Sequence, residues 1–193
     1  MEPRTLGIIN LQKGDVMATS ESQILTETKL RRIKWLSSQD KGKEFNNLMH
    51  LFNEESLEQC YHELDGRKAI GVDKVTKDEY GENLQCNIKE LVAKLKRMSY
   101  KPGDLREVKI PKDGSNGKMR TLGISNFEDK IIQKMTQKVL ENIYDPIFLE
   151  SSFGFRPGLG CHDAIRALEN HLMVNEVETV IDIDLANFFD PSH

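Results

Sequence analysis

The spacing of hydrophobic positions along the chain predicts a series of amphipathic helices. Apolar residues recur three and four positions apart, as they do on the buried face of a helix, in five stretches: 24–36, 45–64, 84–95, 127–145 and 161–173. Thr76 with Glu79 and Ser125 with Glu128 have capping-box spacing, which marks the start of a helix. Before about Ser20 the pattern is weak, and we expect a loose arm there.

Two shorter regions have the alternating pattern of strands. Residues 105–110 and 119–124 flank the turn-forming run Asp113-Gly114-Ser115-Asn116-Gly117, so this region is predicted to be a β-hairpin. Residues 179–185 predict one further strand, and the helix before it is expected to bury Ile165, Leu168 and Leu172. Helices and strands are intermixed without a regular βαβ alternation, which favours the α+β class.

The composition fits a soluble globular protein. Of 193 residues, 38% are hydrophobic and 30% are charged, and no apolar run has the length of a membrane span or of a secretory signal. The three cysteines are far apart in the sequence, which argues against a disulfide framework and against a zinc site. These features predict a cytoplasmic protein without a membrane partner.

The net charge of −4 hides an uneven distribution. Residues 89–138 contain thirteen Lys or Arg against six Asp or Glu, so the rest of the chain is strongly acidic. A basic face on an acidic body is typical of a nucleic-acid partner, although a solvated lysine-rich helix would give the same count.

Asp182 and Asp184 lie two positions apart in the last predicted strand and would share one of its faces. Carboxylates at the end of a hydrophobic strand need a positive partner, and a divalent cation is the usual one. The alternative is that they only mark the strand end or face a lysine.

The predicted hairpin is rich in cations, namely Arg106, Lys109, Lys112, Lys118 and Arg120. Such a hairpin suits contact with phosphates, because Arg can bind them bidentately and Lys acts as a point charge. An edge hairpin protected by lysines is the alternative. The alternation alone does not say which of these charges meet.

Four blocks in this order resemble the N-terminal part of bacterial group II intron-encoded reverse transcriptases, the maturases. They are KAIGVDKVT (68–76), VKIPKDGSNGKMRTLGI (108–124), FGFRPGLGCHDAI (153–165) and VIDIDLANFFD (180–190). The resemblance implies an N-terminal extension with a basic helix (1–40), a fingers region with fingers–palm helices (41–175) and the first strand of the palm (176–193).

The resemblance also implies roles for individual residues. Asp184 matches the aspartate that binds catalytic Mg²⁺, Leu185 would offer a backbone carbonyl to the metal, and Phe189 matches the gate against the nucleotide sugar. Lys112 and Arg120 match the cations that bind the triphosphate, and Asp190 has a less certain role. Nucleic-acid contacts are expected at Arg31, Arg32, Lys34, Arg106, Lys109 and Arg156.

The implied activity is RNA-directed DNA synthesis with two Mg²⁺ ions, deoxynucleoside triphosphates, an RNA template and a DNA primer, together with binding of intron RNA. This sequence has no Tyr-x-Asp-Asp pair, which the family uses to complete its metal site. We therefore expect an inactive N-terminal piece, in which an exposed fingers–palm seam would favour a homodimer. The alternatives are a non-catalytic RNA-binding maturase module, or a retron-like, diversity-generating or CRISPR-associated reverse transcriptase.

Overall fold

The computed structural model describes residues 21–111, 117 and 119–185, without the side chains of residues 21–25. The chain forms two compact units, residues 1–147 and residues 148–193. The expected loose arm before Ser20 lies outside the described residues. Within the described residues no helix has both the length and the apolar character needed to cross a membrane.

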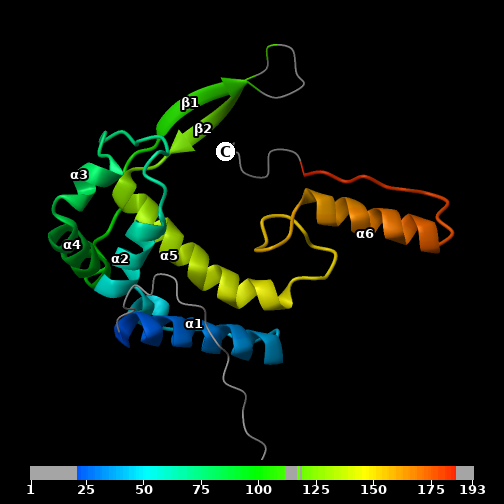
Figure 1. Cartoon of the computed structure of the whole chain (residues 1–193), viewed down its shortest axis with the longest axis horizontal. Coiled ribbons are helices and arrows are strands. Elements are labelled where there is room, and N and C mark those ends of the chain that lie inside the picture. The colour runs from blue at the N-terminus through cyan, green and yellow to red at the C-terminus, as the bar shows by residue number, and fades with distance from the viewer. Residues whose placement is uncertain (1–20, 112–116, 118, 186–193) are drawn as a thin grey trace, which may run out of the picture. The chain divides into compact units, whose positions relative to one another are not determined.

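The first unit is a helical body that carries a β-hairpin, which projects from it in Figure 1. Its helices are α1 (Glu21–Gln39), α2 (Glu54–Glu63), α3 (Lys77–Gly81), α4 (Leu84–Lys96) and α5 (Phe127–Tyr144), with short 3₁₀ turns at Leu48–Leu51 and Asp145–Ile147. The four helices that the periodicity predicted in this region are therefore confirmed. Helix α5 packs against α1 and α2, and α2 packs against α4.

The core of this unit is built from the apolar stripes of its helices. Each helix buries one stripe, and the fully enclosed side chains are Leu51, Leu57, Cys60, Ile88, Leu91, Ile131 and Met135. The Cys60 Sγ and Met135 Sδ atoms lie 4.0 Å apart and join α2 to α5 at the centre of the core. The hydrophobic pattern of the sequence thus identified the face that each helix buries.

The predicted helix starts have different outcomes. Thr76 and Glu79 form the expected capping box at α3, with reciprocal side-chain and backbone hydrogen bonds. Helix α5 differs, because its N-cap is Asn126 and no side chain caps it. The predicted capping box of Ser125 and Glu128 is therefore wrong, since Ser125 is a buried residue whose hydroxyl donates to Gln133 instead.

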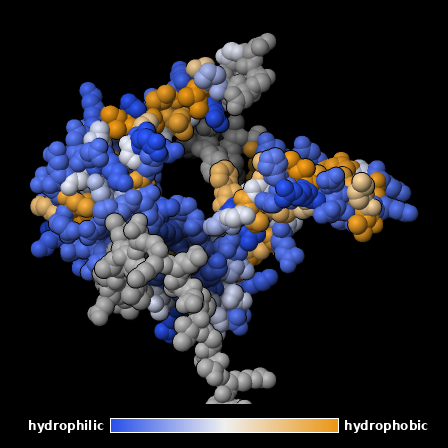
Figure 2. All heavy atoms as spheres, in the orientation of Figure 1, coloured by the Kyte–Doolittle hydropathy of each residue, from blue (hydrophilic) through white to orange (hydrophobic). Residues whose placement is uncertain are grey.

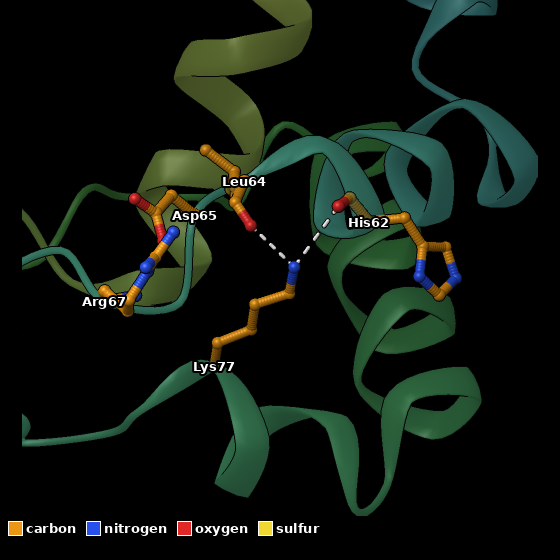
Figure 3. A network of polar contacts seen from close by, with 5 residues as sticks. All are labelled: His62, Leu64, Asp65, Arg67 and Lys77. Atoms are coloured by element: carbon orange, nitrogen blue, oxygen red, sulfur yellow. Dashed lines mark hydrogen bonds and ion pairs between the residues drawn. The ribbon is translucent and has the colours of Figure 1, made fainter.

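Lys77 fastens α3 to the end of α2, as Figure 3 shows. Its Nζ donates hydrogen bonds to the carbonyl oxygens of His62 at 3.2 Å and Leu64 at 2.6 Å, and lies 5.1 Å from the centre of the Tyr61 ring. These carbonyls belong to the last turn of α2, where a cation is favoured by the helix dipole. One lysine therefore satisfies a helix end that the chain then leaves through the Asp65-Gly66 turn.

The β-hairpin confirms the predicted strands and the α+β class. Strand β1 (Arg106–Pro111) pairs antiparallel with β2 (Met119–Ile124), and Arg106 lies opposite Ile124. At the base, Ile124 is buried, whereas most of the hairpin is exposed.

The second unit contains α6 (Cys161–Val174), which confirms the last predicted helix. Two predictions for this unit are wrong. Residues 179–185 form no strand, and the side chains of Ile165, Leu168 and Leu172 are 42–59% exposed instead of buried. Figure 2 shows apolar side chains along the surface of this unit. The physical reason is that a strand needs a neighbour to satisfy its backbone groups, and the described part of this unit supplies none.

Candidate nucleotide and nucleic-acid site

The strand register determines which hairpin cations share a face. Residues directly opposite in an antiparallel pair lie on the same side of the sheet. Arg120 lies opposite Ile110, and Arg106 is an even number of residues away along β1, so both arginines share one face with Val108. Lys109, opposite Thr121, lies on the other face. The register thus places two guanidinium groups on one exposed face, beside a narrow apolar strip.

Asp129 of α5 holds the entrance to β1. Its carboxylate accepts hydrogen bonds from the backbone N–H of Gly103 at 3.1 Å and from the hydroxyl of Tyr100, and only 5% of the residue is exposed. Burial, and then the bond to Asp129, raise the pKa of Tyr100 above its ordinary value, so this phenol stays protonated and keeps donating. Because α5 directly follows β2, the same helix holds both ends of the hairpin.

Asn126, the N-cap of α5, fastens the loop that contains the GVDKVT block. Its Oδ1 accepts hydrogen bonds from the backbone N–H groups of Val72 at 3.0 Å and Asp73 at 3.4 Å. Gly71 is required here, because a Cβ at that position would lie 2.6 Å from the Asn126 Cα atom. One turn further, the Lys130 ammonium donates to the Ala69 carbonyl at 2.5 Å. The block thus forms the support of the hairpin.

A cavity of about 300 Å³ lies between this loop and the hairpin base. Its lining includes Asp73, Tyr80, Lys101, Glu128 and Asp129. The Tyr80 hydroxyl is buried and has no hydrogen-bond partner among the described residues, and burial raises its pKa above the ordinary value. The carboxylates outnumber the cation in this cavity, so it does not suit a phosphate.

The cations of α1 lie on its outer surface. Arg31 and Arg32 are exposed, and the Arg31 guanidinium lies 3.8 Å from the Glu27 carboxylate. Lys34 differs, because its ammonium pairs with Asp145 at 3.3 Å and fastens α1 to the segment after α5. The two arginines are therefore the cations of this helix best placed for a ligand.

The predicted metal residues stand apart from one another. Asp184 and Leu185 are exposed and lie in a segment without a strand, so the predicted shared face of Asp182 and Asp184 is wrong for this structure. Among the described residues, no group of three His, Cys, Asp or Glu side chains could hold a metal ion. Lys112, Lys118, Phe189 and Asp190 lie outside the described residues. The residues present here therefore do not fit a complete Mg²⁺ site.

Arg156 of the second unit has a local role in the structure. Its guanidinium donates to the carbonyl oxygens of Leu149 at 3.1 Å and Ser152 at 2.9 Å, and lies 5.5 Å from the centre of the Phe148 ring. These contacts hold the loop that precedes α6. A nucleic-acid contact of Arg156 stays a prediction.

Sequence reasoning missed Asn126 and Asp129, the two residues that hold the hairpin in place. A buried carboxylate at the third position of a helix has no distinctive sequence signal, since acidic residues in a first turn are common. Its neighbour Gly103 offered the better signal, because Pro102-Gly103 marks a turn whose backbone N–H needs an acceptor.

Comparison with known proteins identifies the class. Residues 110–191 match the family described as reverse transcriptase (RNA-dependent DNA polymerase). The match begins in β1 and includes the hairpin, α5 and α6, and so joins the two units described above.

Individual relatives define the type of reverse transcriptase. The chain is 38% identical over 104 residues to the group II intron-encoded protein LtrA of Lactococcus lactis subsp. cremoris, covering 54% of this chain and 17% of that protein. It is 36% identical over 131 residues to protein YkfC of Escherichia coli K12, covering 66% and 34%. It is 32% identical over 125 residues to the putative COX1/OXI3 intron 2 protein of Saccharomyces cerevisiae, covering 65% and 14%.

These comparisons confirm the predicted resemblance to the reverse transcriptases encoded by group II introns. The chain spans at most about a third of the length of these relatives.

Proposed function

We propose that this chain is the RNA- and nucleotide-binding N-terminal part of a group II intron-encoded reverse transcriptase. The observation that supports it most directly is the exposed hairpin within the matched region, with Arg106 and Arg120 on one face. In this proposal residues 1–40 are the N-terminal extension, residues 41–175 are the fingers with the helices that lead to the palm, and residues 176–193 begin the palm. The predicted cytoplasmic location is part of the same proposal.

The chemistry belongs to an enzyme that contains all the carboxylates of the family. A primer 3′-hydroxyl attacks the α-phosphate of a deoxynucleoside triphosphate, and pyrophosphate leaves. Lys112 and Arg120 would neutralise the triphosphate, since phosphoryl transfer depends on positioning and charge stabilisation. Phe189 would pack against the sugar and disfavour a 2′-hydroxyl.

Asp184, with the Leu185 carbonyl, would supply only part of a Mg²⁺ site. Two metal ions in such an enzyme stabilise the attacking and the leaving oxygens. The other carboxylates of the site do not occur as a Tyr-x-Asp-Asp pair in this sequence. The 193-residue chain should therefore bind nucleic acid without extending a primer.

The second candidate function is a maturase module that binds intron RNA and has no chemistry of its own. The two outward arginines of α1, Arg31 and Arg32, support it, because they provide a basic surface separate from the hairpin. An RNA template would be held mainly through its backbone and 2′-hydroxyl groups in both cases.

Primer extension separates the two candidates. The printed chain should give no Mg²⁺-dependent extension, whereas a longer version that supplies the Tyr-x-Asp-Asp pair should extend a DNA primer on an RNA template. In that longer protein Asp184→Asn should abolish extension, and Asp182→Asn, the matched control, should leave much of it. Activity of the printed chain alone would contradict the proposed division of the metal site. A longer protein that binds RNA and never extends a primer would favour the maturase module.

A further inference from the structure

Trp35, the single tryptophan of the chain, lies on the surface of α1. It is 60% exposed, although tryptophan has one of the largest apolar surfaces of any side chain. The position is well defined, because neighbouring residues fix α1 to the body of the unit. The Ser37 hydroxyl donates to the Ile143 carbonyl at 2.5 Å, and the Lys34 ammonium pairs with Asp145.

The rotation of α1 points Trp35 away from the core. The buried residues of this helix are Thr26, Leu30, Ile33 and Ser37. Successive residues are turned by about 100° around a helix axis, which places Trp35 on the side opposite to that stripe. Helix α1 packs along α5 with its buried side (Figure 1), so the indole belongs to the outer surface of the unit.

Two exposed arginines lie on either side of this indole. Arg31 is four residues before Trp35 and Arg32 is three residues before it, and residues at these spacings are neighbours on a helix surface. The side chain of Arg31 is 82% exposed, and its ion pair with Glu27 is long, at 3.8 Å. An exposed pair of this kind holds its partners only weakly. The surface therefore offers a flat aromatic ring between two available cations.

This combination suits an unpaired nucleotide. Proteins that hold single-stranded nucleic acid combine cations along the backbone with aromatic side chains on which bases stack. Bases in a duplex are already stacked on one another, whereas bases in loops and bulges can stack on a protein ring. A protein partner would more often cover a wider apolar area, but here the indole is flanked by charges.

We propose that Trp35 stacks on an unpaired RNA base while Arg31 and Arg32 contact the flanking phosphates. The inference rests on the proposed RNA-binding function and names the part of the RNA that α1 recognises. It predicts that α1 distinguishes single-stranded from duplex RNA, which the cations alone would not do.

The single tryptophan makes a direct test available. The probes are a labelled 15-nucleotide oligo(A) and the same strand annealed to oligo(U), and binding is followed by the anisotropy of the label. Trp35 emission should be quenched by the single strand and hardly changed by the duplex at concentrations where both bind. Trp35→Ala should weaken binding of the single strand about tenfold and binding of the duplex less than twofold, while Trp35→Phe should keep most of the affinity.

The matched control is Met98→Ala, which removes another exposed apolar side chain of the same unit, 82% exposed at the end of α4. It should change neither affinity, and circular dichroism should show all variants folded. Equal quenching by the duplex, or unchanged single-strand affinity of Trp35→Ala, would overturn this inference and leave the proposed function intact. If neither probe binds the wild-type chain at low salt, the inference and the proposed RNA binding both fail.

Discussion

Replacing Asn126 by alanine tests whether this residue joins the GVDKVT loop to α5. The substitution removes two hydrogen bonds from the backbone N–H groups of Val72 and Asp73, at 3.0 and 3.4 Å. A typical protein hydrogen bond contributes about 0.5–1.5 kcal/mol. The 3.4 Å bond is weak and both donors belong to exposed residues that water can reach, so we expect a loss of about 1.5 kcal/mol in the free energy of unfolding. The usual cost of losing a helix cap does not add to this, because the Asn126 side chain caps nothing.

Asn83 offers a closely matched control. It is the N-cap of α4, makes no side-chain cap hydrogen bond and is exposed. Urea unfolding should therefore show a change within about 0.5 kcal/mol for Asn83→Ala. Hydrogen exchange should also become faster at the Val72 and Asp73 amides in Asn126→Ala. If both alanine variants unfold alike and exchange at these amides is unchanged, the hairpin support described here is wrong.

Three further predictions concern the helical body. Lys77→Met keeps the aliphatic stem but loses both bonds to the end of α2 (Figure 3) and should lower the free energy of unfolding by about 2 kcal/mol, measured in urea; an unchanged value would contradict the capping role. Tyr80→Phe removes a buried hydroxyl without a partner among the described residues and should raise the free energy of unfolding by about 1 kcal/mol; a lower value would mean that the hydroxyl is satisfied. Burial raises the pKa of Cys60 from 9.0 to about 11, so its contribution to stability is complete below pH 9 and is lost as pH rises towards 11. Unfolding measured between pH 8 and 10 should therefore show a smaller decline in Cys60→Ala than in the wild type, and equal declines would contradict this.

The fold of the first unit could be predicted from the sequence because each helix buries a regular stripe. The spacing of Phe127, Ile131, Met135 and Val139 predicted α5, and all four residues are buried. The hairpin followed from two alternating segments around a dense turn. Its register did not follow, because the side on which Arg106 and Arg120 meet depends on which residues pair across the strands.

The last part of the chain shows why a local pattern can fail. Residues 179–185 have the composition of a strand, but strand geometry depends on pairing with a neighbour, which composition cannot guarantee. Ile181 and Ile183 are 77% and 82% exposed in the structure. The support of the hairpin could not be predicted for a related reason, since Asn126 and Asp129 act on backbone groups that are distant in sequence.

The most direct test of the central claim is the salt dependence of RNA binding by hairpin variants. The triple variant Arg106→Gln, Lys109→Gln, Arg120→Gln should bind a structured RNA more weakly than the wild type. Its plot of log affinity against log salt should also be less steep, because fewer counterions are released. The matched control, Lys89→Gln, Lys96→Gln, Arg97→Gln, removes the same charge from exposed positions of α4. The account predicts that the hairpin variant loses clearly more affinity and slope than the α4 variant; equal losses in the two variants, or no salt dependence in the wild type, would contradict it.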